Sequence, residues 1–146
     1  MRHLTVADPK VEQPTLQRLY LVPSSQTAEN GEGQTLDLLA EVIGSGPTSF
    51  LYRRLVLERH VAVNAGAWYM TSAMDDTRFS VYAVPAQGVS LEQLEEEVDE
   101  ALASLPGNAL DAAAIERAKT RLLAETVYQT DSQSSLARIY GSALAI

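Results

Sequence analysis

The sequence predicts an α+β fold, because of its length, its composition and the order of its helical and strand-like segments. Its 146 residues fit one domain, and 46% apolar with 21% charged residues is ordinary for a globular protein. A short strand is followed by two helices, two neighbouring strands and then further helices. Strands and helices grouped in this way are typical of an α+β domain.

Composition argues against several kinds of partner. The formal net charge of -8, from 11 basic and 19 acidic side chains, repels phosphate backbones and anionic lipid. We therefore expect no nucleic acid, and no membrane insertion either, because the sequence has no run of about 18 apolar residues. The sequence has no cysteine, so disulfides, thiolate nucleophiles and cysteine zinc sites are excluded. This composition is compatible with a reducing or an oxidising compartment.

The chain opens with a segment that predicts an interdomain linker. Residues 1–15 hold two prolines and scattered charges without any period, which indicates an extended lead-in. Residues 16–22 then favour a β-strand, and Pro23 ends it because proline cannot continue the hydrogen-bonded ladder. We expect a single domain over residues 16–146.

Two helices separated by a glycine-rich turn come next. The first has apolar residues at helical spacing up to Ile43 and ends at the turn of residues 44–47. Thr48 or Ser49 can cap the second helix. The outward side of that helix carries Arg53, Arg54 and Glu58.

A β-hairpin is predicted after these helices. From Val61 the period changes from 3.6 to 2, and residues 78–84 alternate again after a turn at Asp75 and Asp76. Trp68 and Tyr69 are neighbours on the first of these strands, so they must point to opposite faces. We expect one of them in the core and the other on a surface.

A strongly acidic helix follows the hairpin. Ser90 and Gln93 form a capping box at its start, and Pro106-Gly107 is expected to end it. Six of the 19 acids lie on this helix: Glu92, Glu95, Glu96, Glu97, Asp99 and Glu100. The interpretation we favour is a solvated face, and the alternative is attraction of a basic peptide or partner.

The last part of the chain is predicted to be helical. Asp111 can cap a helix that runs to about Tyr128, with Leu110 and Ile115 placed as a hydrophobic staple. Residues 129–135 favour a bend before a final helix. The apolar, uncapped residues 143–146 suggest that this domain is incomplete at its C-terminal end.

Neither a metal site nor a phosphate site is predicted in this chain. The only histidines are His3 and His60, so no helix carries the two histidines one turn apart that a zinc peptidase needs. We read His60 as a partly exposed helix-end residue rather than a ligand. Residues 44–49 superficially resemble a phosphate loop, but they follow a helix and contain no lysine.

The ordered set of segments resembles the repeating domain of the pitrilysin/insulinase metallopeptidase family, which includes mitochondrial processing peptidase. In that family two homologous domains face each other as a clamshell, and only the first carries the inverted zinc motif. The resemblance here is to the second, zinc-free domain of bacterial two-domain members. It is carried by four segments, namely residues 20–23, residues 38–55 with Gly44-Ser45-Gly46-Pro47-Thr48-Ser49, residues 62–67, and residues 111–123 with Ile115-Glu116-Arg117-Ala118-Lys119.

The resemblance implies an antiparallel-rich sheet with helices packed on one face, as in processing-peptidase-like metallohydrolase domains. It implies a non-catalytic C-terminal domain of a bacterial zinc-dependent peptidase, which helps to enclose and position peptide substrate for a zinc site on a missing N-terminal domain. That domain, or a paralogous subunit, is the expected partner, and zinc is expected there. The alternative is a structural or interaction subunit with no peptidase role. Bacterial periplasm and cytoplasm both stay open as locations.

The resemblance also bears on individual residues. Second domains of the family often supply an arginine and a tyrosine seven residues apart, and Val56 and Val63 stand at those positions here. We therefore predict no catalytic residue. The candidate surface for substrate or partner consists of Arg53, Arg54, Trp68 and Tyr69. The exposed sheet face could line a peptide chamber or dock the other half, and we favour docking, since a half clamshell must bury a contact with its partner.

Overall fold

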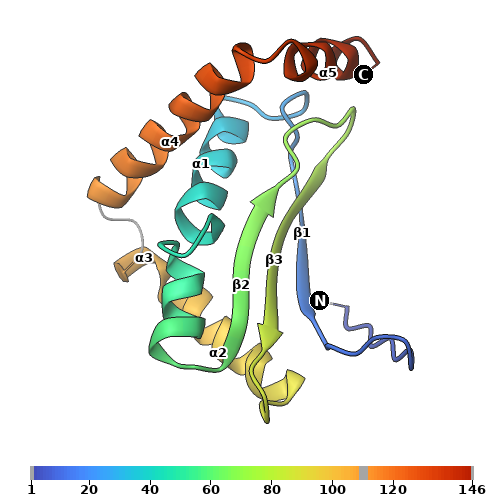
Figure 1. Cartoon of the computed structure of the whole chain (residues 1–146), viewed down its shortest axis with the longest axis vertical. Helices are drawn as coiled ribbons and strands as arrows, with labels where there is room; N and C mark the ends of the chain where they lie inside the picture. Colours follow the sequence, from blue (N-terminus) through green and yellow to red (C-terminus); the bar gives the residue numbers. More distant parts are fainter. Residues whose placement is uncertain (1, 109–111, 146) are drawn as a thin grey trace.

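A computed structural model describes residues 2–108 and 112–145 of the chain, built on a three-stranded sheet (Figure 1). The strands are β1 (Leu16–Val22), β2 (Ala62–Tyr69) and β3 (Thr77–Pro85), arranged in the order β1-β3-β2. Both pairings are antiparallel, so the predicted hairpin and the predicted antiparallel sheet are confirmed.

The helices cover one face of this sheet, as predicted (Figure 1). They are α1 (Glu32–Gly44), the π-helix η1 (Tyr52–Glu58), α2 (Leu91–Ala103), α3 (Leu105–Asn108), α4 (Ala112–Thr130) and α5 (Gln133–Ala145). The first three contact the strands, whereas α4 lies against α1 and α5 continues from α4 at an angle. In the part of the chain that the structure describes, no helix is both long and apolar enough to span a bilayer.

The core lies between the sheet and these helices. Ala67 pairs with Val81 and Tyr69 pairs with Phe79, and all four side chains are buried because they face the helical layer. The helices contribute fully buried side chains to the same core, namely Ile43, Leu51, Leu55, Leu94 and Val98. The alternation predicted for β3 therefore marks the core face correctly.

Glycine allows α1 to come unusually close to β2. A Cβ atom added at Gly44 would lie 2.0 Å from the backbone nitrogen of Ala67, a distance that no side chain can tolerate. A Cβ atom at Gly66 would lie 2.8 Å from the carbonyl oxygen of Gly44. The small residues of this strand thus permit contact between helix backbone and strand backbone.

The second predicted helix is a π-helix rather than an α-helix. Its widened last turn is closed by the Arg59 N–H, which donates to the Arg54 carbonyl oxygen at 3.1 Å. The Val61 N–H donates to the Leu55 carbonyl oxygen at 3.0 Å, and His60 between them has φ 55° in the left-handed region. This is the geometry of a helix C-terminal motif that usually holds glycine.

Two other expectations need correction. The period of 2 placed Val63 on the same side as Ala65, but a β-bulge between Ala62 and Asn64 turns Val63 outward, where it is 50% exposed. The acidic helix ends at Ala103 rather than at Pro106-Gly107, and α3 follows as a separate short helix. The break before the last helix falls between Thr130 and Gln133, as predicted. The predicted cap at Asp111 and the staple residue Leu110 lie outside the described residues.

Candidate functional site

Large apolar side chains are exposed on the sheet face opposite the helices. Leu19 is 61% exposed, Leu21 is 80% exposed and Trp68 is 41% exposed. Leu19 and Trp68 both pair with Ser80 of the central strand, and Leu21 pairs with Arg78 on the same strand. Side chains opposite one another in a sheet share a face, so these five residues form one surface, which we call the open sheet face.

Two details organise the open sheet face. The guanidinium carbon of Arg78 lies 5.1 Å from the ring centroid of Trp68, a cation–π contact that fixes both side chains. Ser80 is buried between its two large neighbours, and its hydroxyl has no hydrogen-bond partner among the described residues. The apolar side chains of Leu19 and Trp68 therefore flank the middle of this face, and the positive charge of Arg78 lies at its side.

Tyr69 belongs to the core and not to this surface. It is 9% exposed, its hydroxyl donates to the Pro23 carbonyl oxygen at 2.7 Å, and its ring stacks on Phe79 at 6.5 Å. Burial raises the pKa of Tyr69, and the negative charges of Asp37 and Glu32 add to the effect. This confirms the prediction that one of Trp68 and Tyr69 is buried in the core and the other lies on a surface. Tyr69 is the buried one, so it cannot form part of the candidate surface.

Arg53 and Arg54 lie elsewhere, in the helical layer. They line a cleft of about 280 Å³ between η1 and the end of α2, together with Phe50, Glu58 and Ser104. Arg54 pairs with Glu58 at 3.2 Å and with Glu100 at 3.5 Å, whereas Arg53 has no ion pair within the described part of the chain. The four candidate residues thus occupy three places, and only Trp68 lies on the open sheet face.

Four of the six acids on the acidic helix form ion pairs with arginines of other elements. Arg18 of β1 binds Glu95 at 3.0 Å and also binds Asp99, and its side chain is almost wholly buried. Arg59 binds Glu100 at 2.6 Å and reaches Glu97 at 3.6 Å. The expected solvated face is therefore partly a set of ion pairs that attaches α2 to β1 and η1. Glu92 and Glu96 are exposed and form no ion pair within the described residues, so part of the face is solvated as expected.

The positions at which the family often places arginine and tyrosine offer no polar group. Val56 packs partly buried against the core, and Val63 lies half exposed in the bulge of β2. Neither side chain can donate a hydrogen bond to a substrate carbonyl. His60 is exposed at the end of η1, and in residues 2–108 and 112–145 no three acidic, histidine or cysteine side chains are grouped to hold a metal ion.

Sequence reasoning missed most of the open sheet face. Leu19, Leu21 and Arg78 were not among the candidate residues, although Leu16–Val22 carries large side chains on both faces of one strand. Four successive apolar residues, at positions 19–22, place large side chains on both faces of the strand, which is typical of a strand covered on both sides. That signal could have identified Leu19 and Leu21.

Known proteins similar to this chain agree with one another. The family described as the peptidase M16 inactive domain matches residues 2–122. A protease from Helicobacter pylori has the same fold, with a TM-score of 0.82 and 23% identity over 95% of this chain. No curated protein sequence is significantly similar to the chain.

Two Bordetella structures are also similar in fold. A protein described as a zinc protease from Bordetella pertussis Tohama I has a TM-score of 0.74 and 20% identity over 96% of this chain. The inactive peptidase domain of a protein described as a zinc protease from Bordetella parapertussis has a TM-score of 0.74 and 18% identity over 92% of this chain. The chain spans 33% of the Helicobacter pylori protein, and 74% and 72% of the two Bordetella chains.

Proposed function

The chain belongs to the peptidase M16 inactive-domain family, and we propose that it is the non-catalytic half of a zinc-dependent peptidase. In this proposal a separate, homologous domain holds zinc and cleaves the peptide bond. This chain closes over that domain and helps to enclose and position the peptide. No catalytic residue is assigned to it.

The observation that carries the proposal is the open sheet face. Single exposed apolar residues are normal, but Leu19 and Leu21 of β1 and Trp68 of β2 share one face of the sheet on either side of β3, and grouped apolar side chains of this kind mark interfaces. Tryptophan and arginine are enriched at such interfaces, and Trp68 and Arg78 already hold each other in place. We assign this surface to docking of the zinc-bearing domain.

Val56 and Val63 limit the proposed role to enclosure. An arginine or tyrosine at these positions could polarise the scissile carbonyl, whereas valine can only exclude water. The same two residues support the second candidate function, a structural or interaction subunit on this fold. The two candidates share the docking surface and differ in whether a zinc-bearing partner gains activity from it.

Binding to a zinc-bearing first domain of the family, encoded upstream or as a separate subunit, tests the docking step. Leu21→Asp places a charge on the proposed contact and should weaken binding, measured by calorimetry, by about tenfold or more. Leu144→Asp makes the same change at an equally exposed leucine on α5 and should leave the affinity within about twofold. Equal losses in the two variants, or no binding of the unmodified chain, would contradict the proposal.

A further inference from the structure

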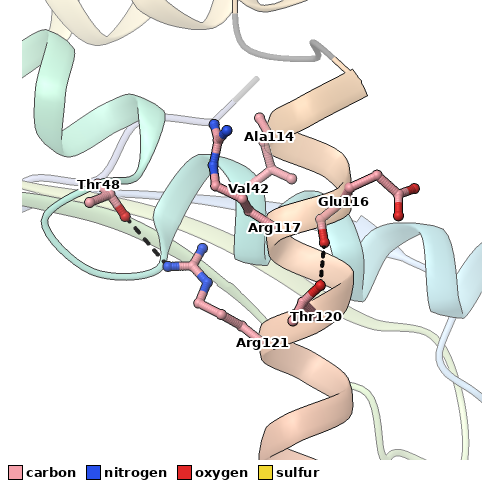
Figure 2. Close-up of a pocket in the computed structure, with 7 residues that line it drawn as sticks. All are labelled: Val42, Thr48, Ala114, Glu116, Arg117, Thr120 and Arg121. Carbon is pink, nitrogen blue, oxygen red and sulfur yellow. Dashed lines mark hydrogen bonds between the residues drawn. The ribbon is translucent and has the colours of Figure 1, made fainter.

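A second concave surface lies on the helical side of the molecule, beside α4. There the helix, the end of α1 and the turn that follows α1 enclose a cleft of about 520 Å³ (Figure 2). The described residues that line it are Val42, Thr48, Ala114, Glu116, Arg117, Thr120 and Arg121. Its volume lies in the range of about 300–1,000 Å³ that is typical of small-molecule sites.

One arginine of the cleft is held in a fixed position. The Arg121 Nε atom lies 2.8 Å from a carboxylate oxygen of Glu41. Its two terminal nitrogens donate to the Thr48 hydroxyl at 3.5 Å and to the Glu41 carbonyl oxygen at 3.4 Å. Arg121 thus joins α4 to the end of α1 and to the turn, and forms a rigid wall of the cleft.

The other arginine, Arg117, has no ion-pair partner among residues 2–108 and 112–145. Arg117 stands four residues before Arg121, so both side chains project from the same side of α4, and Figure 2 shows both guanidinium groups on the side that faces α1. Like charges at this spacing repel each other. Glu41 is the one carboxylate that pairs with either arginine in the described part of the chain. Glu116 points away from the cleft and binds Lys119 at 2.8 Å.

We propose that this cleft binds the terminal carboxylate of a short peptide. The guanidinium of Arg117, for which the described residues supply no carboxylate, can hold a ligand carboxylate through two parallel hydrogen bonds, with Arg121 adding positive charge from the side. Val42 and Ala114 provide apolar surface for the side chain next to that carboxylate. A single guanidinium beside apolar wall fits a carboxylate better than a phosphate, which carries more charge and more acceptors. The inference does not rest on the proposed function and involves no zinc-bearing domain.

The test is an NMR titration of the ¹⁵N-labelled chain with an acetylated tripeptide that ends in leucine. The expected result is a set of amide shifts in α4 and in residues 46–49, and at least tenfold weaker binding of the same peptide with an amidated C-terminus. Equal binding of acid and amide would overturn the proposal. So would shifts confined to another part of the chain, or no shifts with millimolar peptide.

Two variants that each remove one positive charge locate the contact. Arg117→Gln should weaken binding of the free acid by about tenfold, because it removes the charged donor. Arg138→Gln, at an exposed residue of α5 that does not line the cleft, removes the same charge and should change the affinity by less than twofold. Equal losses would show a general effect of charge and overturn the assignment, as would a titration in which inorganic phosphate binds these residues and the peptide does not. Both positions are exposed, and unchanged amide spectra would confirm that both variants fold.

Discussion

The layer in which α1 and η1 pack on β2 is much more tightly packed than the helix pair α4–α5. In the first region Ile43 and Leu55 are fully buried, and the backbone of Gly44 touches the backbone of Ala67. In α4 the described buried residue is Ala118, while Leu123, Val127 and Tyr128 are exposed. Because helices in proteins are stabilised mainly by burial of one face, the free energy of folding must come chiefly from the first region.

The largest difference is expected from one substitution made in both regions. Gly44→Ala forces a methyl group into the Ala67 backbone, and we expect a loss of about 4 kcal/mol or more, enough to threaten folding. Gly141→Ala in α5 meets no atom within 4 Å, and should stabilise by up to about 1 kcal/mol through helix propensity. Urea unfolding followed by circular dichroism measures both. A neutral Gly44→Ala variant would refute the close contact.

Truncating a leucine in each region sharpens the comparison. Leu55→Ala removes a fully buried side chain and should cost about 2–5 kcal/mol of unfolding free energy. Leu123→Ala removes an exposed one and should change it by less than about 0.5 kcal/mol. Denaturant titrations of the two variants check the difference. Comparable losses would mean that α4 contributes as much to the core as η1 does.

A smaller gain in unfolding free energy is expected at His60, the residue with left-handed backbone geometry at the end of η1. His60→Gly should stabilise the protein by about 1 kcal/mol, because glycine adopts φ 55° without steric cost. His60→Ala is the control and should bring no such gain, since alanine meets the same clash. The midpoint of thermal unfolding should therefore be higher for His60→Gly than for His60→Ala. Equal midpoints for the two variants would contradict a steric cost at this position.

The smallest effect concerns the charge at the α1–α4 contact and depends on pH. Burial raises the pKa of Asp37, and the nearby carboxylates Glu41 and Glu125 raise it further. The ionised carboxylate therefore disfavours folding, so Asp37→Asn should stabilise at neutral pH. The gain should shrink as pH falls through the raised pKa, and vanish below the ordinary aspartate pKa of about 4. Asp75→Asn, in the exposed hairpin turn, should show no such gain; a gain for Asp37→Asn that persists in acid would exclude this cause.

Local chemistry made much of the fold predictable. The observed bounds of β1 are the predicted ones, because Pro23 lacks the donor that a continued strand needs. The Ser90 hydroxyl accepts from the Gln93 N–H at 3.2 Å, as the capping box predicted. Period 2 correctly placed Trp68 and Tyr69 on opposite faces, but which face is covered depends on where α1 packs, which no local pattern states.

Distant contacts explain the predictions that failed. Arg18 lies 77 residues before Glu95, so no spacing within the acidic helix reveals that its charges are paired. The π-helical turns of η1 and the bulge at Val63 arise where this helix meets β2, and neither changes the apolar spacing enough to be seen in advance. Most residues of the open sheet face were missed for the same reason, because they come from three strands that are distant in the sequence.

The most direct test of the central claim is cleavage of a quenched fluorescent peptide by a zinc-bearing first domain of the family, with and without this chain. We expect no cleavage by the chain alone, a marked gain in cleavage on mixing, and loss of that gain with a zinc chelator. Cleavage by the chain alone, with one zinc ion tightly bound to it, would contradict the account. A mixture that forms a stable complex without any gain would contradict the peptidase role and leave the interaction subunit.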